Sequence, residues 1–144
     1  MKSALLRQVF LLAAAAIVPA IGEAIYFRER VSWQSPIPAS EMVTVDQARA
    51  WGSNVIWVDA RPDDEFARDH VPGAVSLNED RWNELLPQFQ SIWSPEKKVV
   101  VYCSAQNCNA AREVAERLRK STQPPMQNVF VLEGGWEEWL KKSR

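Results

Sequence analysis

Short apolar runs alternate with helical patterns along most of the chain. Four runs rich in β-branched residues read as strands, at residues 55–58, 74–77, 99–102 and 129–132. Around them, apolar residues recur at helical spacing in three sets, which are Trp82, Leu85, Leu86 and Phe89, then Ala111, Val114, Ala115 and Leu118, then Trp136, Trp139 and Leu140. Apolar strands that alternate with helices predict an α/β fold, with a parallel sheet flanked by helices on both faces.

Local signals indicate where individual elements begin, end or turn. Thr44 and Gln47 form a capping box, which predicts a short helix over residues 45–51. Residues 62–70 predict a further, charged helical turn. Pro87 is expected to kink or end the helix that contains it. The pair Gly134-Gly135 is expected to supply the positive φ of a turn before the last helix.

The N-terminal part of the chain has the pattern of an export segment. Lys2 and Arg7 precede an uncharged, largely apolar stretch over residues 8–22, which predicts a signal peptide or a transmembrane anchor over residues 1–27. Residues 28–41 contain two prolines and no helical period, so they are expected to form a linker. The folded domain is then expected over residues 42–144. It would lie outside the cytoplasm, either anchored to the membrane or periplasmic or secreted.

The overall charge restricts the kinds of partner. The chain has 17 Lys and Arg against 18 Asp and Glu, so nothing points to nucleic acid as a partner or to a polybasic membrane surface. The expected contact with a membrane is through residues 1–27 if they are not cleaved. With 144 residues, the chain has room for one domain with a sizeable core.

The strand over residues 99–102 runs directly into a cysteine, Cys103. In parallel α/β folds, ligands bind beyond the C-terminal ends of the strands. A loop over Ser104, Ala105, Gln106, Asn107 and Cys108 leads to a helix that begins near Asn109. Backbone N–H groups of such a loop, together with the helix N-terminus, would form an anion cradle and would lower the pKa of the Cys103 thiol. The structural alternative is a buried, inert cysteine at a strand end.

Other cysteine chemistries fit the sequence poorly. The two cysteines are spaced C-x4-C and His70 is the only histidine, so a four-ligand zinc site of Cys and His is excluded, and we predict no metal and no cofactor. The C-x-x-C spacing of thioredoxin-type redox sites is absent. A cysteine phosphatase needs an arginine at the position of Asn109, so phosphate hydrolysis is not expected.

Three segments in order resemble rhodanese-like sulfurtransferase domains. These are VDARPDDEFARDHVPGAVSL (58–77), VVVYCSAQNCNAAREVAERL (99–118) and NVFVLEGGWEEWL (128–140). The resemblance implies a rhodanese-like fold with a parallel five-stranded sheet. It also implies that Cys103 takes sulfane sulfur from a small donor such as thiosulfate or a persulfide. The sulfur would be held as a Cys103 persulfide, with the amides of Ser104 to Cys108 around it, and then passed to a thiol or to cyanide.

The chain departs from the family pattern in the loop. Gln106 and Cys108 stand where many members carry a glycine and an arginine or other donor, which makes efficient use of thiosulfate less expected. Two other functions stay open. One is a non-catalytic module that binds an anion or a partner, and the other is thiol–disulfide chemistry in which Cys108 acts as a resolving thiol for Cys103. The alternative for Cys108 is a small residue that packs the loop.

The remaining polar residues of the first segment are expected to have structural roles. Asp59, Arg61 and Glu65 have the residue types of an acid–base set, but they are predicted instead to fix the loop after their strand through hydrogen bonds and an ion pair. His70 precedes a Val-Pro-Gly turn signal and is expected to anchor that turn.

Overall fold

The computed structural model describes residues 7–8, 37–104, 109–122 and 125–144. The chain divides into two compact units, Met1–Ser35 and Pro36–Arg144, and the elements described below belong to the second. The predicted export segment lies outside the described residues, apart from Arg7 and Gln8. Within the described ranges, no helix is both long and apolar enough to cross a membrane.

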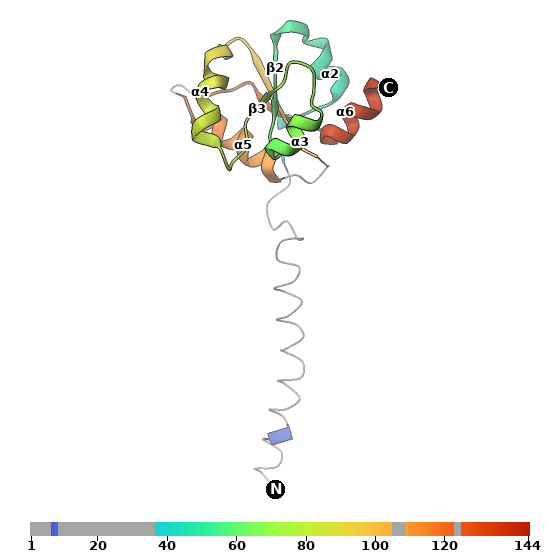
Figure 1. The fold of residues 1–144 in the computed structure, drawn as a ribbon, viewed down its shortest axis with the longest axis vertical. Coiled ribbons are helices and arrows are strands. Elements are labelled where there is room, and N and C mark those ends of the chain that lie inside the picture. Colours follow the sequence, from blue (N-terminus) through green and yellow to red (C-terminus); the bar gives the residue numbers. More distant parts are fainter. Residues whose placement is uncertain (1–6, 9–36, 105–108, 123–124) are drawn as a thin grey trace. The chain divides into compact units, whose positions relative to one another are not determined.

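Strands and helices alternate through the second unit (Figure 1). The described strands are β1 (Met42–Val43), β2 (Val55–Asp59), β3 (Val75–Ser76), β4 (Lys98–Tyr102) and β5 (Val129–Leu132). The helices are α2 (Val45–Ala50), α3 (Asp63–Arg68), α4 (Trp82–Ile92), α5 (Asn109–Lys120) and α6 (Gly135–Ser143). Two short 3-10 helices, η1 (Ala39–Glu41) and η2 (Gly52–Asn54), complete the set.

The strands form one parallel sheet in the order β1-β5-β4-β2-β3, which confirms the predicted α/β fold with a five-stranded parallel sheet. Strand β4 lies in the middle, where it pairs along its whole length with β2 on one side and through Val99–Val101 with β5 on the other. Strand β1, which the hydrophobic pattern does not indicate, has only two residues and pairs with β5 at the edge of the sheet. A central β4 places the residue that follows it in the middle of the C-terminal edge of the sheet.

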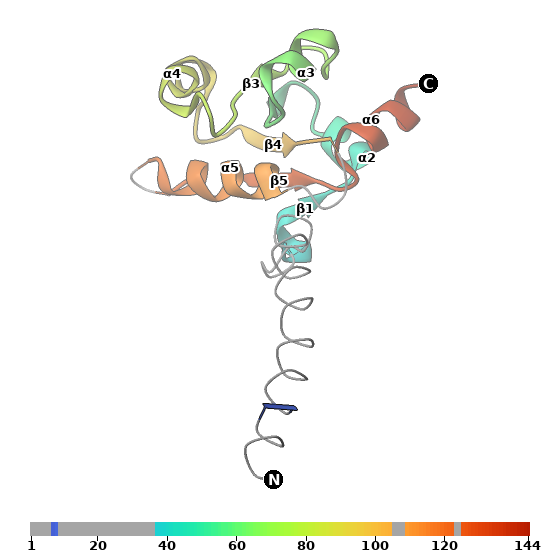
Figure 2. The same cartoon turned by 60° about the horizontal axis from the view of Figure 1, so that its bottom comes forward.

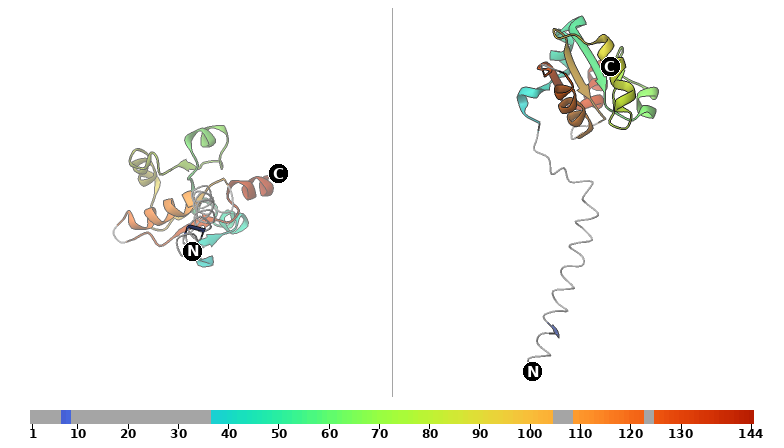
Figure 3. Two further views of the ribbon diagram at one scale, coloured as in Figure 1. Left: turned by 90° about the horizontal axis from the view of Figure 1, so that it is seen from below. Right: turned by 90° about the vertical axis from the view of Figure 1, so that its left-hand side faces the viewer.

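Alternate residues of β4 point into two separate cores, as the period of two in a strand requires. Val99, Val101 and Cys103 belong to the core that α4 and α5 cover, whereas Val100 and Tyr102 belong to the core beside α2 and α6. Figures 1 and 2 show α4 and α5 on one side of the sheet and α2 and α6 on the other, and the view from below in Figure 3 agrees. Cys103 therefore lies on the face covered by α5.

Most local signals correspond to the structure, and one of the two outcomes expected at Pro87 is excluded. The capping box of Thr44 and Gln47 is formed, and both Gly134 and Gly135 have positive φ, at 72° and 56°. Helix α4, however, does not end at Pro87 but continues to Ile92. Proline removes one hydrogen bond from the helix interior. The burial of Phe89 after it, at 0% exposure, holds the second half of α4 against the sheet.

Candidate active site at Cys103

Cys103 follows the last residue of β4, and its side chain is part of the core beneath α4 and α5. Only 3% of the residue is exposed. In the structure Cys103 is disulfide-bonded, and the only other cysteine of the chain, Cys108, lies outside the described residues. The rest of the predicted cradle, Ala105 to Asn107, also lies outside them. Helix α5 begins at Asn109, in agreement with the predicted start of the helix.

Two neighbouring segments hold the backbone at the end of β4. The N–H of Trp136, in the first turn of α6, donates to the carbonyl oxygen of Cys103 at 2.7 Å. The N–H of Ala60 donates to the carbonyl of Tyr102 at 2.9 Å. The left-handed conformation of Gly134 and Gly135 allows the chain to turn from β5 directly into α6, which brings the Trp136 N–H to this position. Cys103 is thus fixed from both sides of β4.

A buried ion pair stands next to this point. The Arg61 guanidinium donates to both carboxylate oxygens of Asp59, with Nη2 at 2.6 Å from Oδ2 and Nε at 2.9 Å from Oδ1. Asp59 is 0% exposed and Arg61 is 4% exposed. Burial lowers the pKa of Arg61, but the hydrogen bonds and charge of Asp59 outweigh it, so the pKa stands above its ordinary value. Arg61 also donates to the carbonyl of Asp69 at 2.7 Å, which fixes the chain after α3.

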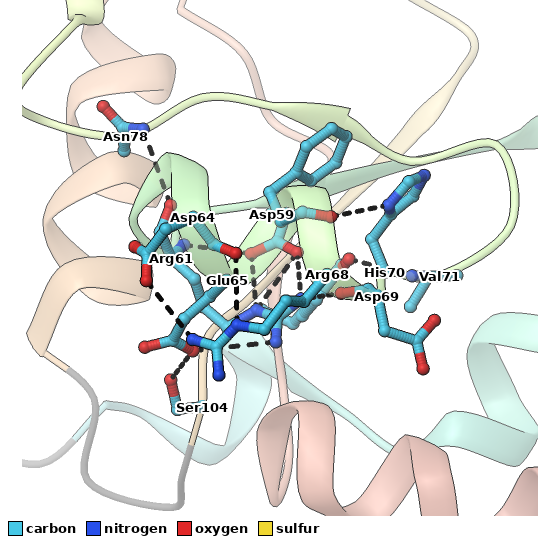
Figure 4. A network of polar contacts seen from close by, with 12 residues as sticks. Asp59, Arg61, Asp64, Glu65, Arg68, Asp69, His70, Val71, Asn78 and Ser104 are labelled. Atoms are coloured by element: carbon cyan, nitrogen blue, oxygen red, sulfur yellow. Dashed lines mark hydrogen bonds and ion pairs between the residues drawn. The ribbon is translucent and has the colours of Figure 1, made fainter.

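Glu65, in the first turn of α3, connects this ion pair to the loop after Cys103. Its Oε2 accepts a hydrogen bond from the Ser104 hydroxyl at 2.9 Å and lies 3.7 Å from Nη1 of Arg61 (Figure 4). Figure 4 shows Arg61 and Ser104 both close to the Glu65 carboxylate. Two segments 39 residues apart in the chain, α3 and the end of β4, are therefore joined by one side-chain contact.

Two aromatic rings complete the surroundings of Arg61. Its guanidinium lies 4.6 Å from the ring centre of Trp136 and 5.7 Å from that of Tyr102. The Tyr102 hydroxyl accepts from the N–H of Val71 at 3.1 Å, and burial raises the pKa of Tyr102 well above its ordinary value. Arg61 therefore contacts Asp59, Glu65 and Trp136. Glu65 accepts from the Ser104 hydroxyl, and the Trp136 N–H donates to the Cys103 carbonyl.

His70 lies on the turn after α3 and contacts its own segment. Its Nδ1 lies 2.9 Å from the carbonyl oxygen of Phe66, and its ring stacks on the Phe66 ring at 4.1 Å between centres. Both contacts hold the imidazole ring against Phe66 of α3. Within the described ranges, no group of three or more His, Cys, Asp or Glu side chains is placed to hold a metal ion.

The C-terminal edge of the sheet also bears a cleft. It has a volume of about 360 Å³ and lies at the ends of β1 and β5, beside the start of α2 and one face of α6. Its charged lining residues are Asp46, Glu133, Glu138 and Lys142. Cys103 is not part of this lining, although the register of β4 and β5 places Glu133 at the same level of the sheet as Cys103.

The family of the chain follows from comparison with known proteins. The family model of the rhodanese-like domain matches residues 44–142. The chain belongs to the rhodanese-like domain family. A comparison with curated proteins found no significant match.

Solved structures with the same fold include a rhodanese-related protein from Thermoplasma volcanium. It is 17% identical, with a TM-score of 0.54, and the match covers 71% of this chain and 92% of that one. A protein from Bacillus halodurans is 22% identical, with a TM-score of 0.58 and coverage of 87% and 82%. A protein from Rhodopseudomonas palustris, described as a possible tyrosine phosphatase, is 24% identical, with a TM-score of 0.55 and coverage of 72% and 81%. At these identities the likeness concerns the fold alone.

Two contacts of the site are not foreseen by the sequence patterns. The Glu65–Ser104 hydrogen bond joins α3 to the end of β4, and the Trp136 N–H joins α6 to Cys103. Ser104 is expected to contribute its backbone amide, whereas the structure gives its side chain a further, specific partner. The sequence indicates Glu65 as a partner of the loop after β2, but no signal in it points to Ser104 as the residue that Glu65 accepts from.

Proposed function

We propose that this rhodanese-like protein is a sulfurtransferase that carries sulfane sulfur as a persulfide on Cys103. The observation that carries the proposal is the place of Cys103 at the end of the central strand, ahead of a loop and of helix α5. Its backbone is held by Trp136, and the next residue is held by Glu65. A nucleophile fixed in this way reacts from one defined position.

The cycle begins with the reduced thiolate of Cys103. The thiolate attacks the outer sulfur of a donor and displaces the rest of the donor with its electron pair. With a thiosulfonate, the products are a Cys103 persulfide anion and a sulfinate. An acceptor then attacks the outer sulfur of the persulfide, so that cyanide becomes thiocyanate, or a thiolate becomes a persulfide, and the Cys103 thiolate returns. Two transfers replace one direct reaction, which is the advantage of covalent catalysis.

Sulfur transfer requires an anionic sulfur on Cys103, and the N-terminus of α5 would stabilise this charge. The N-terminus of a helix bears roughly half a positive charge, and its first N–H groups have no partner within the helix. Helix α5 has 12 residues and packs on the same core as Cys103, through Ala111. The thiolate and the persulfide are both stabilised by such a field. A neighbouring histidine is therefore not required to activate Cys103.

The test is sulfur transfer to cyanide by the reduced full chain. Methanethiosulfonate serves as the donor, thiocyanate is measured, and Cys103→Ser and Cys108→Ser are compared with the unchanged chain. We expect Cys103→Ser to abolish thiocyanate formation above the uncatalysed rate and Cys108→Ser to retain it. Turnover by Cys103→Ser at the unchanged rate contradicts the proposal. The absence of turnover in every protein, with both thiols verified as reduced, supports a non-catalytic binding module instead.

A second candidate function is thiol–disulfide exchange, and the disulfide-bonded state of Cys103 favours it. In this reaction a substrate dithiol gives two electrons and two protons to the Cys103 disulfide, which yields two thiols and a substrate disulfide. Cys108 would be the resolving thiol. Oxidation of dithiothreitol under defined redox buffers tests this function, because both Cys103→Ser and Cys108→Ser would abolish it. Sulfur transfer, in contrast, needs only Cys103.

A further inference from the structure

The charges around Cys103 bear on which sulfur donors the site accepts. We infer that Glu65 determines donor specificity: its carboxylate disfavours doubly charged donors and so directs the site toward donors with one negative charge or none. This inference rests on the proposed sulfur transfer. It assigns to Glu65 a role beyond holding the loop.

The Glu65 carboxylate lies close to where the donor must bind. Its Oε2 is 2.9 Å from the hydroxyl of Ser104, the residue directly after Cys103. Covalent geometry keeps a serine hydroxyl within about 4 Å of its own amide nitrogen, so Oε2 lies within roughly 7 Å of the Ser104 N–H. That N–H is the first donor of the predicted anion cradle. The Glu65 side chain is 33% exposed, so the carboxylate is in contact with solvent near the site.

Arg61 neutralises this carboxylate only in part. Its guanidinium is held at 2.6 Å by Asp59, whereas it lies 3.7 Å from the Glu65 carboxylate. Asp59, Arg61 and Glu65 together carry one net negative charge beside Cys103. Most of the excess charge lies on Glu65, because Arg61 is closer to Asp59 than to Glu65.

The acids of the cleft on the same sheet edge are mostly paired. The cleft is lined by Asp46, Glu133, Glu138 and Lys142. Lys142 is paired with Asp46 at 2.7 Å, and Glu138 is paired with Lys141 at 3.4 Å. The loop over residues 104–108 contains no Lys or Arg in the sequence. Arg112, the first cation of α5, is paired with Glu116 at 2.9 Å.

Repulsion between a fixed carboxylate and a bound donor grows in proportion to the charge of the donor. Thiosulfate carries two negative charges and methanethiosulfonate carries one. Both give their outer sulfur to a thiolate by the same displacement, with sulfite dianion or methanesulfinate as the leaving group. We therefore compare the rate constant for loading Cys103 from thiosulfate with that from methanethiosulfonate. Their ratio measures how strongly the site selects by donor charge, because the reactivity of the cysteine enters both rate constants.

The experiment measures this ratio for the reduced full chain and for Glu65→Gln, Glu65→Asp and Asp64→Asn. Loading is followed by mass spectrometry as the gain of one sulfur on Cys103. Glu65→Gln keeps an oxygen that can accept from Ser104 and removes the charge. We expect it to raise the ratio of thiosulfate to methanethiosulfonate about fivefold at low salt. Glu65→Asp, which keeps the charge, should leave the ratio near that of the unchanged chain.

Asp64→Asn is the matched control, because Asp64 is a neighbouring acid on α3 that is 75% exposed and paired with Arg68. It should change the ratio by less than twofold. The ratio should rise as salt is added in every protein, because salt also screens the repulsion between the Cys103 thiolate and the donor. The rise should be smaller in Glu65→Gln than in the unchanged chain and in Glu65→Asp, because only Glu65→Gln lacks the carboxylate charge.

The outcomes separate the inference from the proposed function. If both donors load Cys103 and Glu65→Gln changes neither the ratio nor its dependence on salt, the role of Glu65 is wrong and sulfur transfer stands. If Asp64→Asn raises the ratio as much as Glu65→Gln, the effect belongs to the net charge of the chain, and the specific role of Glu65 is again wrong. If neither donor loads Cys103 in any protein, the proposed sulfur transfer fails and the inference fails with it.

Discussion

Replacement of Arg61 by methionine tests the buried ion pair that supports the site. Methionine retains an unbranched apolar side chain beside the Trp136 ring but removes the charge. The Asp59 carboxylate, at 0% exposure, accepts four contacts of 3.1 Å or less from Arg61. The variant loses the three from the guanidinium and keeps the one from the backbone N–H, at 2.9 Å. The guanidinium contacts vanish and the charge stays buried.

Removal of one partner from a buried ion pair costs about 3–5 kcal/mol, because the remaining charge has no compensation. The loss is large compared with the roughly 5–15 kcal/mol that holds a typical domain together. For a domain of about 100 residues it corresponds to a fall in Tm of roughly 15–25 °C. Thermal unfolding followed by circular dichroism measures this fall.

Two further variants make the test specific. Arg68→Met breaks the Arg68–Asp64 pair, whose side chains are 73% and 75% exposed, so the expected cost is below about 1 kcal/mol. The double variant Asp59→Asn with Arg61→Met removes the stranded charge and should unfold at a higher temperature than Arg61→Met alone. If Arg61→Met and Arg68→Met lower Tm equally, the reasoning about the buried pair is refuted.

Two other predictions concern the turn before α6 and the stability of the domain at acid pH. Gly134→Ala should destabilise the domain by about 1–3 kcal/mol more than Gly73→Ala. Both positions have positive φ, but only at Gly134 would a Cβ lie 2.6 Å from Cβ of Glu138. Equal losses of unfolding free energy in urea would contradict this. The hydrogen bond from Arg81 lowers the pKa of Asp63, so its stabilising contribution is complete above about pH 5 and is lost as the pH falls through the range below about 4. The slope of Tm between those conditions should be smaller in Asp63→Asn, and an unchanged slope would exclude this contribution.

The layers of the fold could be predicted from the sequence because its periodicities are strong. The buried β-branched run before Cys103 and the helical spacing of Ala111, Val114 and Leu118 indicate a strand and a helix without any tertiary information. Strand β1 was not predicted, since two residues are too few to show a period. Its pairing with β5 depends on a contact across about 90 residues of chain, which a local pattern does not contain.

The site could be predicted only in part, because some of its contacts join segments that are far apart in the chain. The position of Cys103 after an apolar run indicates the C-terminal edge of the sheet, and Asp59 with Arg61 suggests a local ion pair two residues apart. The partner of Ser104 depends on the sheet order, because α3 reaches the end of β4 only when β2 and β4 are neighbours. The N–H of Trp136 depends likewise on the adjacency of β4 and β5.

Whether Cys103 carries sulfur is measured by the mass of the peptide that contains it. The reduced full chain is treated with methanethiosulfonate, the excess donor is removed, and the peptide is analysed before and after addition of a thiol. We predict a gain of one sulfur atom on Cys103, which the thiol then removes as a persulfide. An unchanged mass of this peptide after donor treatment, in protein whose thiols are shown to be reduced, would show that Cys103 does not carry sulfur.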